Sequence, residues 1–471
     1  MILKLYSWLL ILAQPLLRAK LARRGAHEAG YLEAVDERFG HYGAAAGEGY
    51  VWLHAVSLGE TRAAAILIER LRAELPGMQL LLTHGTATGR AEGARLLRAG
   101  DVQAWLPWDT APIVDRFLAH FKPRVGILME TEVWPQLALR CKARGVPLVL
   151  ANGRLSAKSL LQAQRLSWIA LPAYRALTAV WAQTIADAQR FGQLSAPVQG
   201  VFGNLKFDAA PDAVQVAQGQ AWRKQTGRPV VMFASSREGE EQLLLEQIAA
   251  HGAVLASATD SATARATASA TARATASATE SASATDSDSD SDSATGTGTA
   301  TATTAMQWLI VPRHPQRFDE VAALVAKHGL SVSRRSAWGT GDAAQPQQAD
   351  VWIGDSLGEM ALYYGLADVA LLGGSFASLG GQNLIEAAAC GCPVVMGPST
   401  FNFAEAAELA QEAGAAMRVA GMQQGVEAGV ALAGNAPRRE GMSRAAARFS
   451  AEHRGAAAKT AQAVVQILAA R

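Results

Sequence analysis

Short apolar runs alternate with polar loops and helical segments along most of this chain, and this alternation leaves few folds open to it. The apolar runs of the first half lie at 50–55, 79–83, 125–129, 146–151, 179–182 and 198–201. Such a repeat is typical of a parallel sheet whose strands are connected by helices, and ligands of such sheets bind at the edge where the strands end. The sequence therefore predicts an α/β domain that gathers these residues around one crevice: Glu60, Thr88, Glu130, Glu132, Asn152 and Arg154.

The same pattern begins again after a linker at 209–211. The apolar runs of this second half lie at 229–234, 308–311, 351–354, 369–372 and 393–396. A chain of 471 residues is long enough for two domains, and its alanine-rich end at 444–471 is helical in composition. We therefore predict an N-terminal membrane-associated segment at 1–24, Rossmann-like domains at 25–210 and 211–452, and a helix at 453–471 that packs back on the first domain.

Glycines in the second half favour a nucleotide site. The run at 369–372 ends in Gly373-Gly374-Ser375, and Gly380-Gly381 precede a helical segment that carries Glu386 one turn in. Glycines let the backbone approach a ligand, and a helix N-terminus offers free N–H groups to a phosphate. We expect Glu386 to reach the hydroxyls of the attached sugar. The alternative is that these glycines form ordinary turns.

Arg313 and His314 follow the apolar run at 308–311. Both side chains can donate hydrogen bonds to a phosphate and neutralise its charge. The alternative for His314 is a structural imidazole. A further loop and helix start lies at 355–360, where we expect an N-cap.

The N-terminus combines an apolar run with a basic cluster. Residues 1–17 are mostly apolar but include Lys4, Gln14 and Pro15, and the run is shorter than the roughly 20 residues that span a bilayer. Arg18, Lys20, Arg23 and Arg24 follow it, and no small-residue cleavage site is present. The sequence predicts either a marginal transmembrane anchor or an interfacial helix on the cytoplasmic side. The alternative is a buried helix of a soluble domain.

Residues 257–305 are almost wholly alanine, serine, threonine and aspartate. Without large apolar residues this segment cannot offset the entropy of ordering, so we expect a disordered insertion in a surface loop. Its Asp-Ser repeats resemble metal-binding carboxylate pairs, but low-complexity sequence produces such matches by chance.

Charge and cysteine content narrow the class of protein. The chain has 43 Lys and Arg against 41 Asp and Glu, and the net charge of +2 argues against a nucleic-acid-binding surface. Three cysteines are an odd number, and Cys390 and Cys392 have no second pair with which to hold a metal. A reducing cytoplasm is expected.

Six motifs occur in one order along the chain and together resemble the 3-deoxy-D-manno-octulosonic acid (Kdo) transferases of lipid A assembly, which have the GT-B architecture. They are HAVSLGE at 54–60, ETEVWP at 130–135, NGRLS at 152–156, GNLKFD at 203–208, PRHP at 312–315 and the glycine-rich stretch at 371–403. The resemblance covers nearly the whole chain apart from 257–305. It implies two Rossmann-like parallel-sheet domains facing a central cleft.

The resemblance also implies the reaction. Members transfer Kdo from CMP-Kdo to the tetraacyldisaccharide 1,4'-bisphosphate precursor of lipid A (lipid IVA), with inversion and without a metal or other cofactor. The implied location is the cytoplasmic face of the cell inner membrane, where the lipid acceptor lies. The partners are CMP-Kdo, this lipid and the membrane surface, and no nucleic acid.

By position, the resemblance makes Glu60 the general base, and Glu130 and Lys206 the residues that stabilise the transition state. The residues that match CMP-contacting segments are Arg313, His314, Leu357, Gly358, Glu359, Asn383, Leu384, Ile385 and Glu386. No residue is assigned to a metal.

The chain departs from the family pattern at three places. Gln382 stands where His is usual, Ser236-Arg237 where Thr-His is usual, and Leu384 where Pro is usual. Two alternatives stay open: another GT-B nucleotide-sugar transferase or epimerase, and a catalytically silent scaffold that binds lipid. The number of Kdo residues added, the oligomeric state and the pose of the N-terminal helix are also open.

Overall fold

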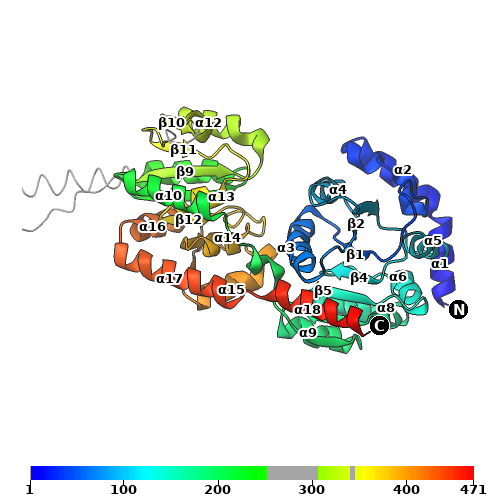
Figure 1. Cartoon of the computed structure of the whole chain (residues 1–471). Coiled ribbons are helices and arrows are strands. Elements are labelled where there is room, and N and C mark those ends of the chain that lie inside the picture. The colour runs from blue at the N-terminus through cyan, green and yellow to red at the C-terminus, as the bar shows by residue number, and fades with distance from the viewer. Residues whose placement is uncertain (1, 252–305, 340–344, 471) are drawn as a thin grey trace, which may run out of the picture. The chain divides into compact units, whose positions relative to one another are not determined.

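The computed structural model describes residues 2–251, 306–339 and 345–470. The chain divides into two compact units, and Figure 1 labels the elements of both. Unit 1 comprises Met1–Ala210 and Ala451–Arg471, and unit 2 comprises Pro211–Ser450. The predicted insertion at 257–305 lies outside the described residues.

Unit 1 contains a seven-stranded parallel sheet in the order β3-β2-β1-β4-β5-β6-β7. Its strands are β1 Val51–His54, β2 Leu80–His84, β3 Val102–Trp105, β4 Val125–Met129, β5 Leu148–Gly153, β6 Ala179–Ala182 and β7 Val198–Val201. Its helices are α1 Ile2–Leu12, α2 Gln14–Gly25, α3 Leu58–Glu74, α4 Ala87–Ala94, α5 Ala111–Phe121, α6 Pro135–Ala143, α7 Ala157–Arg165, α8 Ser167–Ala176, α9 Ile185–Gln193 and α18 Ala456–Ala469.

Helices cover both faces of this sheet, and its central strands are therefore buried along their whole length and mostly apolar. Alternate residues of β1 enter different cores: Trp52 packs with Phe117 of α5, whereas Leu53 belongs with Leu67 of α3 and Ala461 of α18. α18 thus completes the core of unit 1 from the far end of the chain. Its first turn is held by Asp208, whose carboxylate accepts hydrogen bonds from the N–H groups of Gly455 and Ala457.

Unit 2 contains a second seven-stranded parallel sheet, in the order β10-β11-β9-β8-β12-β13-β14. Its strands are β8 Val230–Ser236, β9 Gln307–Pro312, β10 Val332–Arg334, β11 Val351–Ile353, β12 Val369–Leu372, β13 Val394–Met396 and β14 Ala416–Arg418. A helix follows β8 from residue 240, and the other helices are α10 Ala213–Gln225, α12 Phe318–Lys327, α13 Met360–Leu366, α14 Leu384–Ala389, α15 Ala404–Glu412, α16 Met422–Ala433 and α17 Ala436–Glu452.

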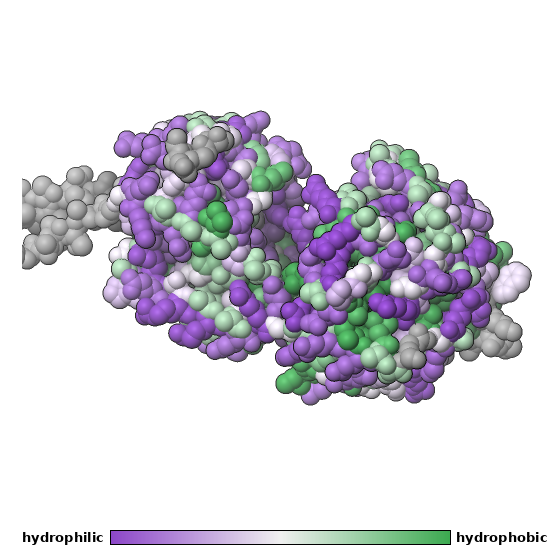
Figure 2. All heavy atoms as spheres, viewed as in Figure 1, coloured by the Kyte–Doolittle hydropathy of each residue, from purple (hydrophilic) through white to green (hydrophobic). Residues whose placement is uncertain are grey.

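The predicted α/β fold with two Rossmann-like parallel sheets is confirmed. The sequence did not predict β3, β10 and β14, which are short edge strands with polar residues such as Gln103 and Arg418. The alanine-rich end predicted to be helical at 444–471 is not one helix. α17 ends at Glu452, and Gly455 has a φ of +106° before α18 begins. The face in view in Figure 2 is mostly hydrophilic, with hydrophobic residues in smaller groups.

The helix start predicted within 355–360 is confirmed at Met360, but the side-chain N-cap expected there is wrong. The Asp355 carboxylate accepts hydrogen bonds from Ser336 and forms an ion pair with Arg334. It therefore does not cap α13, which begins at Met360 without a side-chain cap. Within the three described ranges, no helix combines the length and the hydrophobicity of a membrane span.

Gly219 allows α10 and α13 to pack backbone against backbone. A Cβ at Gly219 would lie 2.1 Å from the carbonyl oxygen of Leu362. We therefore expect Gly219→Ala to lower the free energy of unfolding of unit 2 by about 3 kcal/mol, because the helices must move apart. In the control Gly441→Ala, nothing lies within 4 Å of the new Cβ. Urea unfolding followed by circular dichroism should separate the two variants, and equal stabilities would contradict the prediction.

Candidate active site

Glu60 lies in the first turn of α3, directly after the loop that leaves β1. Ser57 caps this helix and donates a hydrogen bond from its hydroxyl to Glu60 Oε1 at 3.1 Å, while the Val56 N–H donates to Oε2 at 2.9 Å. Burial raises the pKa of Glu60 to about 7; the bond from Val56 opposes this shift, and the charges of Glu130 and Glu132 add to it. A carboxylate with this pKa is suited to take up a proton near neutral pH.

The loop that carries Val56 is held by the loop after β2. The Val56 carbonyl accepts hydrogen bonds from the N–H groups of Gly85 and Thr86 and, at 2.9 Å, from the Thr86 hydroxyl. At Gly89, a Cβ would lie 2.9 Å from the same carbonyl oxygen, so the close approach requires glycine. The Gly85–Gly89 segment therefore fixes the backbone that orients the Glu60 carboxylate.

Glu130 directly follows β4, and Asn152 is the penultimate residue of the neighbouring strand β5; both are in the left-handed region, with φ of +57° and +54°. Such a conformation is uncommon for residues other than glycine and occurs often at functional sites. Glu130 lies 3.6 Å from Lys206 Nζ and 3.5 Å from the Asn152 side chain. Asn152 also accepts the N–H of Leu205, so it holds the short helix that carries Lys206.

The structure thus brings Glu60, Glu130, Glu132, Asn152 and Lys206 together at the carboxyl edge of the unit 1 sheet. Thr88 and Arg154 lie on the same edge, but both are exposed. The Thr88 hydroxyl lies 3.5 Å from that of Thr86, and the Arg154 backbone N–H donates to the Glu130 carbonyl. Neither side chain has a described contact with Glu60.

In unit 2, basic groups gather where the adjacent strands β8 and β9 end. Burial and the charges of Arg237, Arg313 and Arg317 lower the pKa of His314. Arg317 is partly neutralised by Glu241 at 2.8 Å and Glu320 at 3.1 Å. The cluster has the chemistry of an anion site, in agreement with the phosphate predicted at Arg313 and His314.

The backbone N–H groups of the glycine loops that precede α14 have acceptors within unit 2, whereas a phosphate at the N-terminus of α14 itself stays a prediction. The buried carboxylate of Glu240 accepts the N–H groups of Gly374 at 2.7 Å and of Arg237, Phe376 and Ala377 at 3.0 to 3.1 Å. Gly380 N–H donates to Ser399. These amides already have acceptors, so they are not free to bind a phosphate.

Sequence reasoning missed Glu240, since nothing in the order of residues 235–240 shows that its carboxylate turns back to a loop more than a hundred residues away. The three departures from the family pattern lie close by. Ser236 donates to Glu241 at 2.7 Å, and the Gln382 side chain lies against Gly374. Leu384 is buried at the start of α14, which Asn383 caps through the N–H of Ile385.

Glu386 and Arg313 both lie close enough to the buried hydroxyl of Tyr364 to influence its pKa. Burial raises the pKa of Tyr364 well above its usual range; Glu386 adds to the shift and Arg313 opposes it. The neighbouring Tyr363 contacts Ser356, whose hydroxyl also binds Glu359. α13 therefore joins the predicted contacts at 313–314 and 386 to the loop at 357–359.

That loop has an exposed Leu357, and Gly358 has a φ of +80°. Glu359 pairs with Arg335 at 2.9 Å.

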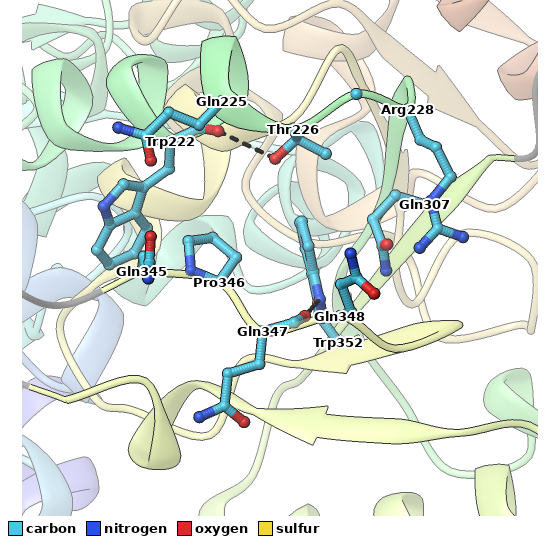
Figure 3. A pocket seen from close by; sticks show the side chains of 11 residues that line it. Trp222, Gln225, Thr226, Arg228, Gln307, Gln345, Pro346, Gln347, Gln348 and Trp352 are labelled. Carbon is cyan, nitrogen blue, oxygen red and sulfur yellow. Dashed lines mark hydrogen bonds between the residues drawn. The ribbon is translucent and has the colours of Figure 1, made fainter.

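A cavity of about 340 Å³ in unit 2 lies away from these residues (Figure 3). Its walls include Trp222, Arg228, Gln307 and Trp352, and the segments at 225–228 and 345–348 precede β8 and β11. It therefore opens at the amino edge of the sheet and contains none of the predicted site residues. Among the described residues, no group of three or more His, Cys, Asp or Glu side chains is arranged to hold a metal.

Two α/β units, each built on a seven-stranded parallel sheet, define the GT-B fold of glycosyltransferases. A glycosyltransferase from Rickettsia africae shares this fold with a TM-score of 0.52 at 11% identity, over 89% of this chain and 99% of that one. UDP-GlcNAc 2-epimerase from Neisseria meningitidis shares it with a TM-score of 0.51 at 13% identity, over 90% of this chain and all of that one.

Sequence comparison defines the family. Residues 33–209 match the family described as 3-deoxy-D-manno-octulosonic-acid transferase (kdotransferase). The chain is 42% identical to 3-deoxy-D-manno-octulosonic acid transferase of Bordetella pertussis over 459 residues, 96% of each protein. It is 28% identical to that of Haemophilus influenzae over 96% of this chain and 95% of the relative. The chain belongs to the 3-deoxy-D-manno-octulosonic acid transferase family.

Proposed function

We propose that this protein transfers Kdo from CMP-Kdo to lipid IVA, with inversion at the anomeric carbon and without a metal or other cofactor. Family membership supports the transferred sugar. The observation that carries the proposal is Glu60, a half-buried carboxylate with a pKa of about 7 beside Glu130 at the carboxyl edge of its sheet. Acid–base chemistry is what attack by a sugar hydroxyl requires.

In this mechanism, Glu60 takes the proton from a hydroxyl of the acceptor sugar. The hydroxyl oxygen forms a bond to the anomeric carbon of Kdo while the bond from that carbon to the phosphate of CMP breaks. The electron pair leaves with CMP. Glu130 and Lys206 stabilise the transition state, since Lys206 supplies a positive charge that Glu130 holds in place at 3.6 Å.

For the donor, the proposal assigns the phosphate of CMP to Arg313 and His314 and the ribose to Glu386. The remaining contacts of CMP are assigned to the loop at 357–359 and to Asn383, Leu384 and Ile385. The lowered pKa of His314 keeps its imidazole neutral at pH 7, so the ring donates a hydrogen bond while Arg313 supplies charge.

The proposed location is the cytoplasmic face of the inner membrane, because the acceptor is a membrane lipid. Residues 1–24 are proposed to attach the protein there. Leu5, Trp8, Leu9 and Leu12 on α1 are each more than half exposed, which supports contact with lipid.

Mass spectrometry of the lipid product tests this function. The full chain is incubated with CMP-Kdo and lipid IVA dispersed in detergent, in the presence of a chelator and without added metal. A mass gain of one or more Kdo units is expected, and it would also give the number transferred. No product despite CMP-Kdo binding would indicate a silent scaffold, and neither product nor binding would indicate a different donor.

The pH dependence of transfer should report the pKa of Glu60. The base acts only when ionised, and its pKa is about 7. We therefore expect kcat/KM to rise with pH, about tenfold per unit well below pH 7, and to level off above it. Initial rates at subsaturating acceptor, with donor stability checked at each pH, measure this profile. A flat profile between about pH 5.5 and 7 would contradict Glu60 as the base.

A further inference from the structure

α1 has two distinct faces. Leu5, Trp8, Leu9 and Leu12 follow the i, i+3, i+4, i+7 spacing of one helical stripe and are exposed by 60%, 63%, 57% and 69%. Leu16, at the start of α2, is exposed by 74% and continues the apolar surface. A stripe of this size in contact with water is unusual unless something covers it.

The opposite face of α1 is fixed to unit 1 by hydrogen bonds. The Tyr6 hydroxyl donates to the buried carboxylate of Asp109 at 3.0 Å, and Ser7 Oγ accepts the N–H of Ala111 at 3.0 Å. The Gln136 side chain donates to the Leu3 carbonyl at 2.8 Å. A helix that left unit 1 to cross a bilayer would leave these buried groups without partners, at considerable cost. The contacts therefore hold α1 lengthwise against the domain.

A second apolar group lies beside α1, on the α7–α8 pair. Leu161, Leu166 and Trp168 are exposed by 57%, 46% and 49%. α1 contacts both α6 and α8, and Figure 1 shows these helices side by side within unit 1. The two groups therefore belong to one side of the same domain.

Both elements carry only positive charge. The segment Ile2–Gly25 contains five Lys and Arg and no Asp or Glu, and 157–176 contains three and none. Lys20, Arg23, Lys158 and Arg165 are exposed. Apolar side chains with tryptophan and flanking basic residues match the interface of an anionic phospholipid bilayer.

This surface borders the edge of the sheet that carries Glu60. Asp109 and Gln136 lie where the chain enters α5 and α6 after β3 and β4, and α7 begins directly after β5. All three strands are parallel, so these sites share the carboxyl edge with Glu130 and Asn152. A bilayer against this surface would present its headgroups near the candidate base.

We propose that α1 lies in the plane of an anionic bilayer and that the α7–α8 pair forms a second point of membrane contact. The apolar docking surface consists of Leu5, Trp8, Leu9, Leu12 and Leu16 together with Leu161, Leu166 and Trp168. The proposal rests on the proposed function only in taking the acceptor to be a membrane lipid. Of the two poses that the sequence left open for the N-terminal helix, it selects the interfacial one.

Vesicle binding tests the second contact. The combined substitution Leu161→Ser, Leu166→Ser and Trp168→Ser should weaken binding of the full chain to vesicles of phosphatidylethanolamine and phosphatidylglycerol about tenfold. The control Ile185→Ser changes a more exposed apolar residue of unit 1, 69% accessible on α9, and should bind as the parent does. Equal binding of both variants would overturn the role of α7–α8.

An assay of the same variant and of the parent for transfer to detergent-dispersed lipid IVA distinguishes this proposal from the proposed function. Retained transfer with weakened vesicle binding supports a docking role. Parallel loss of both would overturn it, because the residues would then be needed for folding or for the reaction itself. Absence of transfer in the parent protein, with vesicle binding intact, would contradict the proposed function alone.

Depth measurements test the pose of α1. Fluorophores are attached at Leu5→Cys, Leu12→Cys or Leu166→Cys in a Cys390→Ser background, since Cys141 and Cys392 are buried. Quenching by lipids brominated at different depths should place all three labels at one shallow depth. A spanning helix would separate positions 5 and 12 by about 10 Å, because each residue rises about 1.5 Å, and that result would overturn the proposal.

Discussion

Glu60→Gln is expected to lower kcat for Kdo transfer by about 10³-fold while CMP-Kdo binding and folding stay intact. General acid–base groups contribute roughly 10² to 10⁴ in rate, and glutamine has the shape of glutamate without its basicity. The glutamine oxygen can still accept the Val56 N–H, which now lies 2.9 Å from the carboxylate. Single-turnover transfer assays and calorimetric titration with CMP separate the chemical step from donor binding.

The control for this variant is Glu69→Gln, which removes a charge from the same helix. Glu69 is exposed and pairs with Arg72 and Arg98, and pairs of this kind contribute little. We expect its kcat to stay within about twofold of the parent. Residual activity of Glu60→Gln above roughly a tenth of the parent would exclude Glu60 as the base. Loss of activity together with loss of thermal stability would indicate instead that Glu60 serves mainly to cap α3.

Glu240→Ala is expected to lower the free energy of unfolding of unit 2 by about 3 to 5 kcal/mol and to abolish detectable donor binding. Removing a buried carboxylate leaves the buried groups that donate hydrogen bonds to it without an acceptor. Here the partners are four backbone N–H groups, at Arg237, Gly374, Phe376 and Ala377. The loops after β8 and β12 would then separate, and Arg237 would leave the basic cluster around His314.

Urea unfolding followed by circular dichroism should show the lower free energy of unfolding as a transition of unit 2 at lower urea concentration. Glu240→Gln keeps one acceptor oxygen and should lie between the parent and Glu240→Ala. The control is Glu246→Ala on the same helix, where the carboxylate is exposed and accepts a hydrogen bond from Gln242. If Glu240→Ala matches this control in both stability and CMP affinity, Glu240 does not hold the donor loops.

Glu240 also explains how the second sheet can carry a donor site although its glycine loops offer few free amides. The carboxylate closes these loops from inside the unit, with the Gly374 N–H at 2.7 Å. Basic side chains then gather beside His314, whose pKa is lowered by burial and by the charges of Arg237, Arg313 and Arg317. Glycines at 374, 380 and 381 all have positive φ, so they serve the tight path of the loop.

The fold was predictable from the sequence because its signals are local. Buried strands such as 125–129 and 369–372 have the bounds that their apolar runs predict, and polar loops follow them at the carboxyl edge. The edge strands β3, β10 and β14 were not predictable, and β10 and β14 have only three residues each and gain their structure from one neighbouring strand. In these strands pairing outweighs a weak local preference.

The candidate site was predictable only in its residue types. Motif spacing brought Glu60, Glu130 and Lys206 to attention, and the structure shows Glu130 beside Lys206 and close enough to Glu60 to raise its pKa. Spacing did not indicate which backbone amides of the glycine loops are already bonded. Hydrogen-bond acceptors for these amides come from residue 240, which is 134 positions before Gly374.

The order of residues by itself determined the two parallel α/β domains, the edge at which polar groups gather and the family to which the chain belongs. Each follows from short-range periodicity or from a run of neighbouring residues. Only the tertiary structure decided that Glu240 occupies the loop amides and that α1 is tied to Asp109 and Gln136 along one face. Such contacts join residues more than a hundred positions apart, and a buried polar group takes whichever partner the fold brings within reach.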